Sequence, residues 1–287
     1  MTLRDHLKSG RARLVAAGID PSEAARDAAL LARHALGWDA ATLLMRDPDP
    51  APPEFEAAFA SLLDRRMHRE PVAYIRGEQE FWGRAFAVSP AVLIPRPETE
   101  LIIDEALAHL RPPAPLHSHT LICDIGTGSG CLAVTLAAER SHAHVVATDI
   151  SADALTVARA NAERHGVAGR IEFRKGSYLA GATGRFDLIV ANPPYITDAD
   201  YSALAPEVRD FEPKLALAAG PDGLRDIRDI LTHSADALAP AGVLLMEIGY
   251  NQAPSVRSLV SAIPSLTLRE IVEDLQHIPR IVVAQRR

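Results

Sequence analysis

Two short segments of the chain carry residue types whose spacing could support chemistry. The first is the glycine-rich loop Asp124-Ile125-Gly126-Thr127-Gly128-Ser129-Gly130, which follows the apolar run 121–123. Its G-x-G-x-G spacing differs from the pattern of dinucleotide sites, and it lacks the lysine of a P-loop. Asp149 follows the next apolar run, where an acid can accept hydrogen bonds from ribose hydroxyls. The pair predicts a site for an adenosine-type ligand that needs no phosphate cradle, with a dehydrogenase-like site as the alternative.

The second segment is Asn192-Pro193-Pro194-Tyr195, which comes directly after the predicted strand 186–191. Prolines lack a backbone N–H group, so the carbonyl groups around this turn are stiffly oriented acceptors. The alternative is a rigid turn that ends a strand and packs its tyrosine. Because the glycine-rich loop precedes it in the same chain, we favour a functional site.

The elements around both segments alternate between short apolar runs and helical patterns. The runs lie at 121–123, 145–147, 171–173, 188–190 and 243–246, and the helical patterns at 130–140, 152–165, 224–238 and 252–262. This alternation predicts a mostly parallel sheet covered on both faces, which binds ligands at the carboxyl ends of its strands. Residues 266–272 and 281–285 predict two further strands, and residues 111–116 a Pro-rich linker.

The N-terminal part reads differently, as helices only. Asp20-Pro21-Ser22-Glu23 supplies a capping side chain, a proline in the first turn and a capping-box glutamate, so we expect a helix from there to about Gly37. A further helix is expected where Phe55, Phe59 and Leu63 form an apolar stripe. Aromatic residues around Gly83 predict a β-hairpin. We therefore expect a helical domain at 1–75, a β-hairpin linker at 76–98 and an α/β domain at 99–287.

Composition narrows the classes of function. The chain has 287 residues, 48% of them hydrophobic and 23% charged, which is typical of a globular protein. A formal charge of −7 works against non-specific binding to nucleic acid or anionic lipid. No apolar stretch approaches the roughly 20 residues of a membrane helix. Cys123 and Cys131 lie in no metal or redox spacing, which indicates a reducing cytoplasm, and the 11 histidines show no metal-binding pattern.

Together these motifs resemble the S-adenosylmethionine methyltransferases that act on planar amino or amide nitrogens. More closely, the chain resembles the HemK/PrmC family, the protein-(glutamine-N5) methyltransferases that modify class I peptide chain release factors. The loop and Asn-Pro-Pro-Tyr are shared with many methyltransferases, whereas the segment Ile94–Glu100 and the helical domain point to this family. The resemblance extends over nearly the whole chain, through Glu80–Gly83, Leu93–Glu100, Asp124–Gly130, Asn192–Ile196, Phe211–Pro213, Gly220–Leu224 and Glu247–Gly249.

The resemblance implies a fold, an activity and a set of site residues. The fold is a seven-stranded Rossmann-like class I methyltransferase domain after a small all-helical domain that docks the substrate protein. The activity is transfer of a methyl group from S-adenosyl-L-methionine to the glutamine N5 of a release factor's Gly-Gly-Gln motif, which leaves S-adenosyl-L-homocysteine. The implied cofactor-binding residues are Gly126, Thr127, Gly128, Ser129, Gly130, Asp149, Tyr178 and Asn192. The implied substrate-binding residues are Asn192, Pro193, Pro194 and Tyr195, and the catalytic ones are Asn192, Pro193 and Tyr195.

In this mechanism the site orients the amide and does not activate it. Asn192 Oδ1 and the Pro193 carbonyl each accept one N–H of the acceptor glutamine, and Tyr195 stacks on the amide plane. Near-attack positioning of this kind can contribute up to roughly 7–11 kcal/mol, so no general base is named. Arg96 and Glu98 either shape the pocket or form an ion pair and a helix cap.

Several features keep alternatives open. Gly176-Ser177 stands where many methyltransferases carry an acid for the adenine amino group, and residues 274–280 lack the usual glycine of that turn. The second hypothesis is a nucleic-acid amino methyltransferase acting on adenine N6 or guanine N2, and the third is a cofactor-binding module without catalysis. Residues 1–75 carry ten Lys and Arg against eleven Asp and Glu, which favours docking of a protein. We expect a monomer that binds neither membranes nor nucleic acid directly.

Overall fold

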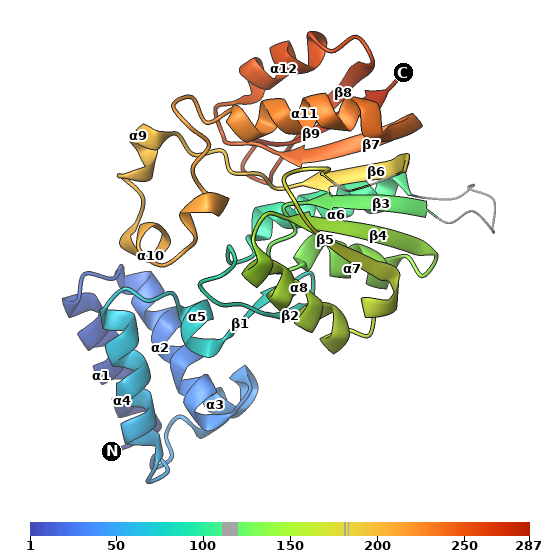
Figure 1. The fold of residues 1–287 in the computed structure, drawn as a ribbon. Coiled ribbons are helices and arrows are strands. Elements are labelled where there is room, and N and C mark those ends of the chain that lie inside the picture. Colours follow the sequence, from blue (N-terminus) through green and yellow to red (C-terminus); the bar gives the residue numbers. More distant parts are fainter. Residues whose placement is uncertain (111–119, 181, 183) are drawn as a thin grey trace. The chain divides into compact units, whose positions relative to one another are not determined.

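The computed structural model describes residues 1–110, 120–180, 182 and 184–287, and they form two compact units (Figure 1). The first unit contains Met1–Glu78 together with Ala205–Phe211, and the second contains Gln79–Leu204 and Glu212–Arg287. The chain therefore leaves the second unit for one short segment and then returns to it. The Pro-rich linker expected at 111–116 lies outside the described residues.

The first unit is helical. Its elements are α1 (Leu3–Ala16), α2 (Pro21–Leu36), α3 (Ala40–Arg46), α4 (Phe55–Met67), α5 (Val72–Arg76) and, in the second segment, α10 (Pro206–Arg209). Helix α2 begins where the sequence predicts, because the Asp20 carboxylate accepts hydrogen bonds from the backbone N–H groups of Ser22 and Glu23. It ends at Gly37, whose φ of 65° is the left-handed conformation that stops helices. The stripe of Phe55, Phe59 and Leu63 is buried in this unit's own core.

The second unit opens with the expected hairpin and continues as a seven-stranded sheet. The hairpin is β1 (Glu78–Phe81) and β2 (Arg84–Ala87), and Trp82 and Gly83 form its turn with positive φ angles of 52° and 68°. The sheet contains β3 (Thr120–Ile125), β4 (Ala143–Asp149), β5 (Ile171–Lys175), β6 (Phe186–Ala191), β7 (Leu238–Glu247), β8 (Leu266–Glu273) and β9 (Pro279–Arg286). Its strand order is β5-β4-β3-β6-β7-β9-β8. The expected seven-stranded, mostly parallel α/β sheet is confirmed.

Alternating residues of the central strands pack into two separate cores. Ile122 and Leu188 belong to one core with α6 (Glu100–His109), α7 (Cys131–Glu139) and α8 (Ala152–Arg164). Cys123 and Ile189 belong to the other with α11 (Arg225–Ala237) and α12 (Ala253–Ser261). Figure 1 shows α11 and α12 on one face of the sheet and α7 and α8 on the other. Strands buried on both faces explain the apolar runs in the sequence.

The central strands are parallel and end together. In the register, Ile125 of β3 pairs with Thr148 of β4 and with Ala191 of β6, which in turn pairs with Met246 of β7. The residues that follow these strand ends therefore meet at one edge of the sheet.

The short helix α9 (Asp198–Tyr201) follows β6. None of the described helices is both long and apolar enough to cross a membrane.

Candidate active site

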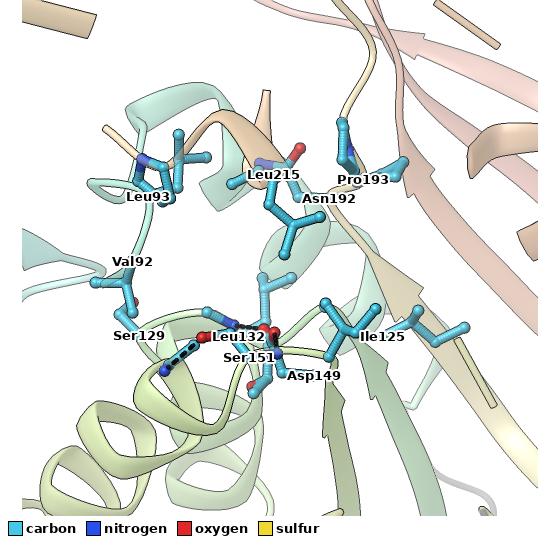
Figure 2. Close-up of a pocket in the computed structure, with 18 of the residues that line it drawn as sticks. Val92, Leu93, Ile125, Ser129, Leu132, Asp149, Ser151, Asn192, Pro193 and Leu215 are labelled. Atoms are coloured by element: carbon cyan, nitrogen blue, oxygen red, sulfur yellow. Dashed lines mark hydrogen bonds between the residues drawn. The ribbon is translucent and has the colours of Figure 1, made fainter. Parts of the chain in front are cut away.

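A cavity lies at this edge, and most of the residues that the sequence singles out line it. These are Gly126, Thr127, Gly128, Ser129, Asp149, Tyr178, Asn192, Pro193 and Pro194. In Figure 2, Asn192, Pro193 and Leu215 lie on one side of the space, and Ser129, Asp149 and Ser151 lie on the other. The glycine-rich loop and Asn-Pro-Pro-Tyr thus face each other across a single cavity.

The glycine-rich loop is held in place by Asp149. The backbone N–H of Gly128 donates to Asp149 Oδ2 over 2.9 Å, and the N–H of Ser151 donates to Oδ1 over 2.8 Å. Gly128 has a φ of 55°, a conformation that an L side chain rarely adopts. Two backbone donors therefore fix the direction of the Asp149 carboxylate, and its remaining lone pairs are available to a ligand.

Asp124 supports the loop from below. Its Oδ2 accepts from the Thr127 hydroxyl at 2.6 Å and from the Ala133 N–H at 3.1 Å. Among the described residues its Oδ1 has no hydrogen-bond partner. Burial raises the pKa of Asp124 to about 7, and the two donors only partly oppose this rise.

Asn192 enters the cavity with one side of its amide already engaged. Its Nδ2 donates to the Thr99 hydroxyl over 2.9 Å. Thr99 lies just before α6 and is almost fully buried. The engaged nitrogen leaves Asn192 Oδ1 as an acceptor for a molecule in the cavity.

Tyr195 and Gly130, which the sequence assigned to the site, do not line the cavity. The Tyr195 hydroxyl instead donates to Glu247 Oε1 over 3.3 Å, and its backbone carbonyl accepts from Gln252 Nε2 at 3.1 Å. Gly130 has a φ of 82° and directly precedes α7, and a Cβ atom there would lie 3.1 Å from the Ala158 Cβ. The stacking role of Tyr195 stays a prediction, while both residues have structural contacts beside the site.

Tyr178 lines the cavity and is anchored by acids. Its hydroxyl oxygen lies 3.0 Å from Asp226 Oδ1 and 3.0 Å from Asp229 Oδ2, and burial and these carboxylates raise the pKa of the phenol. Asp226 itself lines the cavity. The sequence offered no signal for Asp226, because its position at the start of α11 is typical of any helix.

An ion pair between a partly exposed arginine and a buried glutamate fixes the segment before α6. Arg96 lines the cavity, and its Nη2 donates to Glu212 Oε1 over 2.5 Å. The second carboxylate oxygen of Glu212 accepts from the Ile94 N–H at 3.1 Å. Arg96 therefore has both of the roles considered for it, since it is paired and also borders the pocket; Glu98 is exposed outside the cavity lining.

The cavity wall also contains apolar side chains that sequence reasoning missed. Ile150 and Leu215 are 49% and 55% exposed although they line the cavity. Large apolar side chains that remain exposed around a concave site are typical of a ligand-binding surface. The remaining wall residues that were not anticipated as such are Ala91, Val92, Leu93, Pro95, Thr99, Cys131, Leu132, Ser151, Ala154, Pro213, Ala216 and Ile230.

Comparisons with known sequences cover nearly all of the chain. Residues 5–77 match the PrmC N-terminal domain family, and residues 102–207 match the methyltransferase small domain family. A protein of Cereibacter sphaeroides named release factor glutamine methyltransferase is 47% identical over 99% of this chain and 99% of its own length. A protein of the same name from Nitratidesulfovibrio vulgaris is 44% identical over 99% of this chain and 95% of its own length.

Solved structures show the same fold at lower sequence similarity. The catalytic domain of human Mettl16, solved with an RNA hairpin, is 16% identical, with a TM-score of 0.55 over 79% of this chain and 91% of that one. A methyltransferase from Pyrococcus furiosus is 17% identical, with a TM-score of 0.50 over 79% of this chain and 98% of that one. At these identities the likeness concerns the fold.

Proposed function

This chain belongs to the release factor glutamine methyltransferase family, and we propose that it methylates the side-chain amide nitrogen (N5) of the Gly-Gly-Gln glutamine in class I peptide chain release factors. We further propose S-adenosyl-L-methionine as the methyl donor and the cytoplasm as the place of action. The main structural support for this proposal is the hydrogen bond that Asn192 Nδ2 donates to the Thr99 hydroxyl. This leaves one oriented acceptor, Oδ1, at the wall of the cavity.

The residues opposite Asn192 fit S-adenosyl-L-methionine. Asp149 accepts two backbone N–H groups, so its carboxylate is preset to accept hydrogen bonds from the ribose hydroxyls. Gly128, in the left-handed conformation, lets the backbone approach the ligand. Ile150 and Tyr178 offer apolar surface to the adenine. When bound, the cofactor supplies an electrophilic methyl group on its sulfonium.

The protein's own part in the reaction is to orient a weak nucleophile. An amide nitrogen gains positive charge as it forms a new bond to carbon, so acceptors on its N–H groups favour the transition state over the ground state. Asn192 Oδ1 and the Pro193 carbonyl would each accept one of these N–H groups. The following proline, which has a fixed φ and no N–H, keeps the turn rigid. Preset dipoles of this kind need no reorganisation during the reaction.

The activity is tested with labelled methyl groups. Purified protein is incubated with S-adenosyl-L-methionine labelled on the methyl group and, in separate reactions, with release factor, DNA or ribosomal RNA. Label is expected in release factor alone, on the glutamine of the Gly-Gly-Gln motif by mass spectrometry. Label in DNA or RNA would instead support the amino methyltransferase that the sequence left as second hypothesis, and label in nothing would contradict a catalytic role.

We propose the helical unit as the docking surface for the release factor. Its helix α3 exposes two adjacent apolar side chains, Leu44 at 76% and Met45 at 72%. Replacing both with serine is expected to raise the KM for whole release factor at least about tenfold, because burial of even one such side chain can contribute about 1.5–3 kcal/mol and about 1.4 kcal/mol is a factor of ten. The KM for a short Gly-Gly-Gln peptide should stay unchanged in the same assay.

The matched control for this double variant is Leu275→Ser, which replaces a fully exposed leucine between β8 and β9. It is expected to leave both KM values as they are. An equal rise in KM for protein and peptide in the α3 variant would argue against docking on this surface.

A further inference from the structure

The side-chain amide of Asn192 has two possible orientations, and only one of them serves the proposed reaction. A rotation of 180° about χ2 exchanges the amide oxygen and nitrogen with almost no change in shape. When Oδ1 faces the acceptor glutamine, Asn192 can accept a hydrogen bond from an N–H of the glutamine amide. When Nδ2 faces it instead, two hydrogen-bond donors are brought together and no hydrogen bond can form. Something in the protein must therefore select the orientation.

Thr99 is the neighbour that makes this selection. Its hydroxyl oxygen lies 2.9 Å from Asn192 Nδ2 and 2.7 Å from Glu247 Oε2. A hydroxyl has one proton to donate, and an ionised carboxylate can only accept. Thr99 must therefore donate to Glu247, which leaves only its lone pairs for Asn192. The Asn192 nitrogen is then the group that faces Thr99, and Oδ1 faces away.

Glu247 sets the direction of the whole chain of hydrogen bonds. It ends β7, next to the strand end that precedes Asn192, and only 2% of its surface is exposed. Its other carboxylate oxygen accepts from the Tyr195 hydroxyl at 3.3 Å. The buried Glu247 carboxylate therefore has two donors, the hydroxyls of Thr99 and Tyr195, and the Thr99 hydroxyl is the one that orients the Asn192 amide.

We propose that Thr99 and Glu247 are positioning residues, which act through Asn192 by holding its Oδ1 toward the acceptor amide. This inference rests on the proposed glutamine methylation. It gives a role to Thr99 beyond the start of α6, and to Glu247 beyond the end of β7. It also assigns Tyr195 to the same network, as the second donor to Glu247.

The ionisation of Glu247 becomes a condition for activity in this arrangement. A protonated carboxyl can donate to Thr99, which frees the threonine proton for Asn192 Oδ1 and favours the unproductive orientation. The pKa of Glu247 is raised to about 7, chiefly by burial and to a smaller extent by the nearby Glu98 carboxylate. Thr99, Tyr195 and Arg280 oppose this rise, although Arg280 also donates to Asp274 over 2.9 Å. Turnover should therefore decline as pH falls through about 7.

The test measures kcat and KM between pH 5.5 and 9 with saturating S-adenosyl-L-methionine. Thr99→Val removes the hydroxyl at nearly constant shape and is expected to lower kcat about tenfold, the usual effect of one hydrogen bond, without changing the KM for release factor. The decline at low pH should disappear in Thr99→Val and in Glu247→Gln. Thr99→Ser keeps the hydroxyl and should restore both kcat and the decline.

Two controls separate positioning from folding. Thr135→Val replaces another fully buried threonine, whose hydroxyl has no partner among the described residues, and should leave kcat and its pH profile unchanged. Calorimetric titration with S-adenosyl-L-homocysteine should give the same affinity in all variants within about twofold, and melting curves check the fold.

A readout independent of turnover is the exchange of the Asn192 side-chain amide hydrogens with solvent, measured by NMR. It should be at least about tenfold faster in Thr99→Val than in the unmodified protein, because the Nδ2 hydrogen bond is lost. Unchanged exchange together with unchanged kcat in Thr99→Val would overturn the inference. So would a low-pH decline that persists in Glu247→Gln and thus belongs to another group, such as Asp124. Inactivity of the unmodified protein toward release factor would instead contradict the proposed function, and exchange would still test the positioning.

Discussion

Replacing Asn192 with alanine is expected to lower the kcat of glutamine methylation by about 10²- to 10³-fold, the usual effect of removing one preset dipole that faces developing charge. In the proposed mechanism the variant loses the Oδ1 acceptor, and only the Pro193 carbonyl would remain to orient the amide. The affinity for S-adenosyl-L-homocysteine should change by no more than a few-fold, because Asp149 and the glycine-rich loop lie on the opposite side of the cavity (Figure 2). Single-turnover kinetics and calorimetry measure the two effects.

The control for this variant is Asn251→Ala, which removes an exposed asparagine outside the cavity wall. It should leave kcat unchanged. If Asn192→Ala kept full turnover, the amide-orienting mechanism would be wrong, whatever its effect on cofactor affinity. If it lost cofactor affinity in proportion to kcat, Asn192 would contribute to binding of the cofactor rather than to orientation of the amide.

Those features that depend on neighbouring residues could be predicted from the sequence. The start of α2 depends on Asp20 and its next three residues, and its end depends on Gly37. The sheet strands are continuous apolar runs because both of their faces are buried, as Ile122 and Cys123 in different cores demonstrate. The carboxyl ends of parallel strands lie at one edge, and this brought the glycine-rich loop, Asp149 and Asn192 to one cavity.

Features that depend on distant pairs could not be predicted. Thr99 and Glu247 are 148 residues apart, and Arg96 and Glu212 are 116 apart. No local pattern links such residues, since a carboxylate after a strand has the same appearance whether it faces water or a threonine. The orientation of the Tyr195 side chain also depends on a residue that is distant in the sequence. Its ring follows Asn-Pro-Pro, yet the structure turns its hydroxyl to Glu247 and leaves it outside the cavity lining.

The set of chain segments that form the helical unit is a further feature that could not be predicted. The sequence predicts it as the continuous stretch 1–75, whereas the compact unit includes Ala205–Phe211 as well. Two ion pairs join residues 205–211 to the N-terminal helices. Arg66 Nη2 donates to Glu207 Oε1 over 3.1 Å, and Arg69 Nη2 donates to Glu207 Oε2 over 2.7 Å. The returning segment leads directly to Glu212, which accepts hydrogen bonds from the Ile94 N–H and from Arg96, and Arg96 lines the cavity. One stretch of chain thus connects the proposed docking unit with the wall of the site.

Replacing Arg66 with methionine is expected to destabilise the helical unit by about 3–5 kcal/mol, the usual cost of leaving a buried charge without its partner. Arg66 Nε donates to Asp27 Oδ2 over 2.8 Å, and the two side chains are 5% and 4% exposed. Without the arginine, Asp27 keeps only its contact to Arg26 at 3.8 Å, among the ion pairs of the described residues. Guanidinium unfolding followed by circular dichroism measures the loss.

A second variant separates the unpaired charge from the lost packing. Arg66→Met combined with Asp27→Leu removes both charges at similar volume and should recover most of the lost stability, because a buried ion pair is worth little more than apolar side chains of that size. Arg4→Met, which breaks the exposed pair with Asp47, should hardly shift the unfolding midpoint. Because Arg66 also holds Glu207, the single variant should in addition raise the KM for release factor. If Arg66→Met proved as stable as Arg4→Met, the prediction would be wrong. Asp27 would then remain buried without its arginine at no cost in stability, and residues 205–211 would be held by contacts other than the one from Arg66.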